Sequence, residues 1–267
     1  MPWTFAHPAA VLPLRRLCPR WLNLPALMIG SLMPDLGYYL HRFDWSSLTH
    51  RFPDGLLPCV LAGLVALALF YGLRQPVCQL LPQPHRSALL ALIERQPAFS
   101  LMAILSMMPS LAIGAATHMA WDGLTHRGGW AVMRALALQE PLFYLWGTGA
   151  PAYQVLQHLS TLIGTAALAW AYGRWLRRAG FGFTLRARVS GDREEHWRYR
   201  LLGVIVAVAV ICALFMGVQA ATPLPGKFLL ERFVFFFAVH LMLVFTALLA
   251  ASALCYQWWR GWIHREL

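Results

Sequence analysis

The sequence predicts an all-α integral membrane protein: a helical bundle of five to six transmembrane helices with an N-terminal interfacial or re-entrant helical segment. Three observations predict this fold class. Of the 267 residues, 59% are hydrophobic and only 12% are charged, whereas a soluble domain carries about 25% charged residues. The mean hydropathy is +0.54. Apolar stretches of the length that crosses a bilayer as a helix recur along the chain. Together they exclude an ordinary soluble enzyme, a disordered chain and a disulfide-stapled secreted module.

Five stretches have the length and apolar character of a spanning helix. The two nearest the C-terminus, Leu201–Ala221 and Phe233–Tyr256, are the most uniformly apolar. A sixth stretch, Trp21–Leu40, is apolar but interrupted by Pro25, Pro34 and Asp35, so we expect a shallow, re-entrant or bundle-covered helix there and not a clean span. The five predicted spans are Gly55–Leu73, Leu101–Met119, Tyr153–Tyr172, Leu201–Ala221 and Phe233–Tyr256.

The charges predict an orientation. The formal net charge is +11, and the basic residues collect in short loops between apolar runs. Retention of positive loops in the cytoplasm explains this pattern more simply than nucleic-acid binding, so we expect no nucleic-acid partner. The loops 74–95 and 173–200 and the C-terminus are then cytoplasmic, in a multi-pass protein of the cell inner membrane. Residues 1–54, 122–152 and 221–232 lie on the extracytoplasmic face.

We expect three parts along the chain. Residues 1–175 form a core with three spans and a cluster of His and Asp residues. Residues 176–200 form a basic cytoplasmic loop. Residues 201–267 carry two C-terminal transmembrane helices and a basic tail.

The His and Asp residues of the core gather on one predicted face of the membrane. His118, Asp122 and His126 are spaced i, i+4, i+8, which sets them along one helix face. Two ligands one turn apart clamp a divalent ion, as on the metalloprotease helix. With Asp35 and one or both of His7 and His50, an all-His/Asp metal site is complete. Imidazole plus carboxylate suits zinc, with manganese and iron as alternatives.

Plainer interpretations stand beside this one. A histidine at the membrane edge often bonds only a lipid headgroup or a backbone carbonyl, so the HxxxD pair alone is weak evidence for a metal. His158 lies about one turn into the third predicted span, where it either faces the same cavity or packs between helices. His240 is an intramembrane histidine, for which we favour a buried interhelical bond.

The order of the motifs resembles a known family. The segments PWTFAHPAAVLPLRR, ALMIGSLMPDLGYYL, HMAWDGLTHRGGW and YQVLQHLSTLIG look like the bacterial membrane family named domain of unknown function 4184 (DUF4184), over about residues 1–175. More distantly, the motifs are similar to the inner-membrane metal-dependent hydrolases and to the helical zinc-dependent phospholipase C class. The distant resemblance implies a set of metal ligands, and it matches His126 to the final TH of the motif. The implied ligands are His7, Asp35, His50, His118 and Asp122.

Two functions follow as alternatives. The first is a metal-dependent hydrolase that cleaves an ester or phosphoester of a lipid or envelope component at the bilayer surface, with His126 or His158 beside the ligands or as a proton carrier. The second is a non-enzymatic membrane protein, transporter-like or a scaffold, whose His/Asp cluster is a structural network. In both, the lipid bilayer is the expected partner.

Overall fold

The computed structural model describes residues 4–18, 21–94, 101–145, 148–179, 193–222 and 227–266, most of which are helical. One two-stranded sheet accompanies the helices, and η denotes a 3-10 helix. In chain order the elements are η1 Thr4–Leu17, α1 Leu24–Gly30, η2 Met33–Asp35, α2 Leu36–Tyr39, α3 Phe43–Thr49, α4 Leu56–Leu80, α5 His85–Glu94, α6 Leu101–Thr125, α7 Leu136–Gln139, β1 Pro141–Leu145, β2 Thr148–Pro151, α8 Ala152–Arg178, α9 Arg193–Ala221 and α10 Lys227–Glu266.

The five predicted spans fall on five long helices, namely α4, α6, α8, α9 and α10. Within the described residues, three helical segments are long and apolar enough to cross a membrane: Leu56–Leu80, Glu195–Ala221 and Leu229–Trp262. The helical class predicted from the sequence is therefore confirmed, and three apolar helices agree with a membrane protein. The spans predicted on α6 and α8 stay predictions.

The stretch Trp21–Leu40 is not one continuous helix. It is divided into α1, η2 and α2. Asn23 caps α1 by accepting a hydrogen bond from the Ala26 N–H at 2.9 Å, which satisfies one of the open donors of the first turn. Pro34 lies in η2, where its missing N–H prevents continuation of the helical hydrogen bonds. These breaks turn the chain back toward α6.

The sequence analysis did not predict the two strands. β1 and β2 form an antiparallel hairpin in which Leu145 pairs with Thr148. Leu142, Phe143 and Tyr144 supply the β-favouring aromatic and branched side chains of β1. The stretch is too short to show a clear period, and its prolines and glycines resemble those of an ordinary loop.

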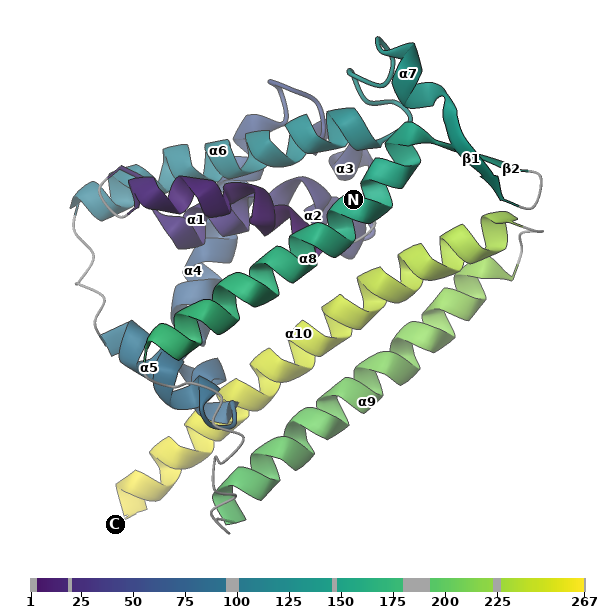
Figure 1. Cartoon of the computed structure of the whole chain (residues 1–267). Coiled ribbons are helices and arrows are strands. Elements are labelled where there is room, and N and C mark those ends of the chain that lie inside the picture. The colour runs from purple at the N-terminus through teal and green to yellow at the C-terminus, as the bar shows by residue number, and fades with distance from the viewer. Residues whose placement is uncertain are drawn as a thin grey trace. The chain divides into compact units, whose positions relative to one another are not determined.

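The chain divides into two compact units, and the first comprises residues 1–68 and 98–172. In it α1 lies along α6, as Figure 1 shows. The two backbones approach closely at two glycines. A Cβ on Gly30 would strike the Leu111 backbone, and one on Gly114 would strike the carbonyl oxygen of Leu27. Small residues permit such backbone contact between helices, and this contact fixes the residues that follow Gly30 against α6.

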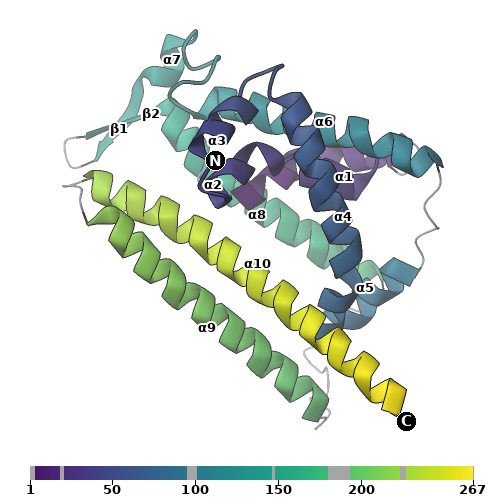
Figure 2. The ribbon, with the colours of Figure 1, turned by 180° about the vertical axis from the view of Figure 1, so that it is seen from behind.

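The second unit comprises residues 69–97 and 173–267. Its main feature is a pair of long helices, α9 and α10, which run side by side in opposite directions (Figure 2). Residues 180–192 lie outside the described part of the chain, so the predicted basic loop 176–200 is described only at its two ends, on α8 and α9.

Candidate metal centre

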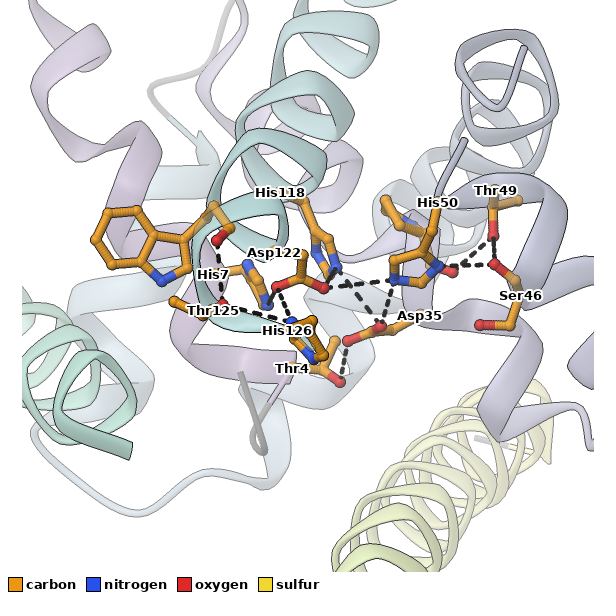
Figure 3. A network of polar contacts seen from close by, with 12 residues as sticks. Thr4, His7, Asp35, Ser46, Thr49, His50, His118, Asp122, Thr125 and His126 are labelled. Carbon is orange, nitrogen blue, oxygen red and sulfur yellow. Dashed lines mark hydrogen bonds and ion pairs between the residues drawn. The ribbon is translucent and has the colours of Figure 1, made fainter. Parts of the chain in front are cut away.

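Four side chains from separate parts of the first unit point at one another (Figure 3). They are Asp35, His50, His118 and Asp122, and one ligand atom of each lies within 4.8 Å of all the others. His118 is fully buried, and Asp35 and Asp122 are nearly so. The structure thus brings together four of the five residues predicted as metal ligands into one group.

The four separations between the carboxylate oxygens and the imidazole nitrogens are longer than charge-assisted hydrogen bonds and close to the ligand–ligand separations of a tetrahedral metal site. The Nε2 of His50 lies 3.2 Å from Asp35 Oδ1 and 3.6 Å from Asp122 Oδ2. The Nε2 of His118 lies 3.5 Å and 3.2 Å from the same two oxygens. A charge-assisted hydrogen bond is shorter, about 2.7–2.9 Å. Ligands about 2.0–2.2 Å from a common ion at tetrahedral angles stand about 3.3–3.6 Å apart.

Both histidines are oriented by main-chain carbonyls. The Nδ1 of His118 lies 2.8 Å from the carbonyl oxygen of Ser31, and the Nδ1 of His50 lies 2.7 Å from that of Ser46. A carbonyl oxygen only accepts, so each Nδ1 carries the proton and donates it. When the ring is neutral, this tautomer directs the lone pair of Nε2 at the carboxylates, which is the arrangement of metal-binding histidines.

Local structure explains how these residues meet. His118 and Asp122 lie one turn apart on α6. Ser31 follows Gly30, at the close approach of α1 to α6, and so reaches His118. Asp35 ends η2. His50 follows α3, which is held to η2 because the Thr49 hydroxyl donates to the Pro34 carbonyl oxygen at 2.8 Å.

The other oxygen of Asp122 faces two further histidines. His7 Nε2 lies 3.6 Å from Asp122 Oδ1, and His126 Nδ1 lies 3.4 Å from it. The His7 ring is fully buried and stacks on His118 with ring centres 3.6 Å apart. Neither of its nitrogens has a hydrogen-bond partner among the described residues. A buried imidazole without a partner is costly, so this position favours a ligand.

The electrostatics separate the histidines into two kinds. Burial opposes the charge on His50, but the carboxylates of Asp122 and Asp35 outweigh it and raise the pKa of His50 to about 9. Burial also opposes the charge on Asp35, yet His118 and His50 hold the pKa of that carboxyl well below its usual value. At His7, burial and the neighbouring His118 keep the pKa well below normal, so this imidazole is neutral.

Comparison with known proteins identifies the family. The family model described as domain of unknown function (DUF4184) matches residues 1–257. The chain belongs to this family. Neither a search of curated proteins nor a search of solved structures found a match. The DUF4184 match extends through the two C-terminal helices, beyond the region in which the motifs were found. The distant resemblance to metal-dependent hydrolases stays a prediction.

Two features of this DUF4184 protein were missed in the sequence. Thr4 Oγ1 donates to Asp35 Oδ2 at 2.6 Å, and the Gln157 amide lies 3.2 Å from His126 Nε2. The neighbouring His158, predicted beside the ligands, is instead exposed. Adjacent helix residues point about 100° apart, so the orientation of α8 determines that Gln157, and not His158, faces His126. The sequence signal that could have identified Thr4 is its hydroxyl group close in sequence to His7.

Proposed function

We propose that this protein is a membrane-embedded, metal-dependent hydrolase that cleaves an ester or phosphoester of a lipid or another envelope component. The single observation that carries the proposal is the group of four ligand atoms from Asp35, His50, His118 and Asp122, which lie within 4.8 Å of one another and whose two imidazoles are oriented by main-chain carbonyls. Two imidazoles and two carboxylates suit zinc, with manganese and iron as alternatives.

The position of the centre supports a substrate in the bilayer. Leu56, in the first turn of the apolar helix α4, packs in one cluster with Met33 of η2 and Met119 of α6. Met119 lies next to His118 in sequence. The centre therefore lies where a helix of spanning length begins, which is the level of the lipid headgroups. From the charges of the loops we further propose that this end lies on the extracytoplasmic side and the C-terminus in the cytoplasm.

The residues of the centre and the neighbouring His126 have different roles in the proposed reaction. A bound divalent ion lowers the pKa of a water and polarises a carbonyl or phosphoryl oxygen. Asp35, His50, His118 and Asp122 hold that ion. His126 has a partly exposed ring, and burial lowers the pKa of this ring below its usual value. It is thus neutral and placed to accept a proton beside Asp122.

His7 extends the same proposal to a second ion. Its Nε2 and the Oδ1 of Asp122 face each other on the side of Asp122 away from His50. A carboxylate that uses one oxygen for each of two ions is common in two-metal hydrolases, whose ions stand about 3.5–4 Å apart. The proposal is therefore one or two ions per chain, with His7 as a ligand of the second.

A structural network is the second candidate. The observation in its favour is the raised pKa of His50, because a protonated His50 would neutralise part of the carboxylate charge without an ion. In that case the cluster only holds η2, α3 and α6 together, in a transporter-like protein or a scaffold.

Metal analysis of the detergent-purified protein distinguishes the metal centre from the structural network. We expect one or two zinc, manganese or iron ions per chain in the wild type. The substitutions His118→Gln and Asp122→Asn should remove the ion, while His85→Gln and Asp44→Asn, outside the cluster, should retain it. Metal at the wild-type level in the first two variants, or none in the wild type, would refute the metal centre. Loaded protein is then assayed on phospholipids and on soluble phosphoesters.

A further inference from the structure

A second surface of the first unit has no role in the metal centre. Between α6 and α8 the chain forms α7 and the β1–β2 hairpin, and this connection exposes large apolar side chains. Leu136 is 74% exposed, Leu142 61% and Tyr144 72%. The group, here called the apolar patch, consists of Trp130, Met133, Leu136, Leu142, Phe143 and Tyr144.

The apolar patch is held by defined contacts to α6. The Ala131 and Val132 N–H groups both donate to the Gly123 carbonyl oxygen, at 3.1 Å and 3.4 Å, and Val132 is buried. The Gln139 amide donates to the Val132 carbonyl oxygen at 2.8 Å. A Cβ on Gly123 would strike the indole of Trp130, so glycine is needed for this approach. The segment is thus fixed at the residue next to Asp122.

The hairpin exposes apolar side chains on both of its faces. Successive paired strand residues point to opposite faces, and Phe143 and Tyr144, which pair with Ala150 and Gly149, are consecutive and both exposed. A two-stranded hairpin alone is marginally stable in water. A protein partner docked on one face would leave the other in water. A lipid leaflet surrounds both faces at once.

The charges and backbone of the segment set the depth. The unpaired edges of two strands cannot enter the hydrocarbon core, because their N–H and C=O groups would lose all partners. At the headgroup level water and lipid polar groups satisfy these edges. Trp and Tyr are enriched at that level, and the exposed Arg127 and Arg134 match the anionic lipid phosphates there.

We propose that the apolar patch lies in the interfacial layer of the lipid leaflet and contacts phospholipid directly. It is a second lipid-facing surface, separate from the spanning helices and joined to α6 at Gly123. This inference does not depend on metal binding or on hydrolysis.

Photocrosslinking of the full-length protein tests it. The photoreactive residue p-benzoylphenylalanine is introduced at Tyr144, and the protein is placed in nanodiscs of phosphatidylethanolamine and phosphatidylglycerol. The same residue at Leu61, an exposed position of the apolar helix α4, is the positive control. Asp44, an exposed residue ion-paired with Arg42, is the aqueous control. Mass spectrometry identifies the adducts after illumination.

We expect phospholipid adducts at Tyr144 in a yield comparable to Leu61, and none at Asp44. A crosslink from Tyr144 to a second copy of the chain would overturn the proposal in favour of a dimer contact. Adducts at Leu61 but neither lipid nor protein adducts at Tyr144 would place the patch in water and also overturn it. Leu142 is a second position for the probe if the Tyr144 variant does not fold. Metal content, measured on the same samples, reports separately on the proposed function.

Discussion

The two units of this protein each contain a largely buried group of ionisable side chains, and the two groups are built differently. In the second unit, Arg86 Nη2 lies 2.6 Å from Glu195 Oε1, and the Gln83 N–H donates to Glu195 Oε2 at 3.1 Å. Arg198 lies 3.5 Å from the same carboxylate and donates to the Gln79 carbonyl oxygen at 3.2 Å. At the metal centre the closest approach between a carboxylate and an imidazole is 3.2 Å.

This difference favours a structural role for the first group and agrees with the ligand binding proposed for the second. Glu195 has its cation and its N–H donor at bonding distance, so this carboxylate is satisfied by the protein alone, although Arg86 Nη1 has no hydrogen bond among the described residues. The imidazoles of the centre instead have their outer nitrogens fixed by carbonyls and their inner nitrogens spaced around a common point. The His118 Nε2 atom has no hydrogen bond among the described residues.

The largest expected effect is on the structural pair. Glu195→Gln leaves Arg86, whose side chain is 19% exposed, and the buried Arg198 without their carboxylate, which costs up to about 3 kcal/mol of unfolding free energy. Metal content should not change. Denaturation in detergent measures the stability, and Glu231→Gln, an exposed matched control, should shift it by less than about 0.5 kcal/mol. If Glu195→Gln were as stable as the wild type, the Glu195 group would have no structural role, and the contrast with the His/Asp cluster would fail.

In the first unit, the perturbation that corresponds to Glu195→Gln is removal of the proposed metal ion. A ligand at 100 times its Kd stabilises the folded state by about 2.7 kcal/mol, so chelation should lower the unfolding temperature and reloading should restore it. Glu195→Gln should respond to the chelator as the wild type does, because its defect lies in the other unit. An unfolding temperature that changes neither with chelator nor with added metal would contradict metal binding by the His/Asp cluster.

A smaller effect is expected at the support of Asp35. Thr4→Val removes the hydroxyl that donates to Asp35 Oδ2 but keeps the side-chain volume. Loss of such a supporting bond weakens metal affinity about tenfold or more. Competition with a metal indicator measures the change. Thr165→Val, which removes an exposed hydroxyl bonded only within α8, is the matched control and should leave the affinity unaltered.

The pH dependence is the most gradual effect. Because the pKa of His50 is raised to about 9, an ion must displace a proton at any lower pH, and affinity should fall about tenfold per pH unit below that value. For the metal-free protein the sign is opposite. Its stability gains fully from protonated His50 below pH about 6.5 and loses this gain as the pH rises through 9. Metal titrations of the wild type over this range measure the slope, and the metal-free His50→Gln variant should lose less stability than the metal-free wild type as the pH rises through about 9.

Much of the fold was predictable because its signals are local. Hydropathy over about twenty residues located the five long helices, and the spacing of His118 and Asp122 placed them on one helix face. Pro25, Pro34 and Asp35 indicated that the stretch 21–40 would not form a clean span. These patterns depend only on neighbours within a few turns of the same helix.

The tertiary structure decided what those local patterns could not. The close approach of Gly30 to α6 orients His118, and the face of α8 brings Gln157 and not His158 to the cluster. The use of both Asp122 oxygens, one toward His50 and one toward His7, depends on three chain segments meeting. Hydropathy and spacing carry no information about contacts between residues far apart in sequence. The sequence alone thus determined a helical membrane protein with a His/Asp cluster, and only the packing of its helices arranged that cluster as a centre.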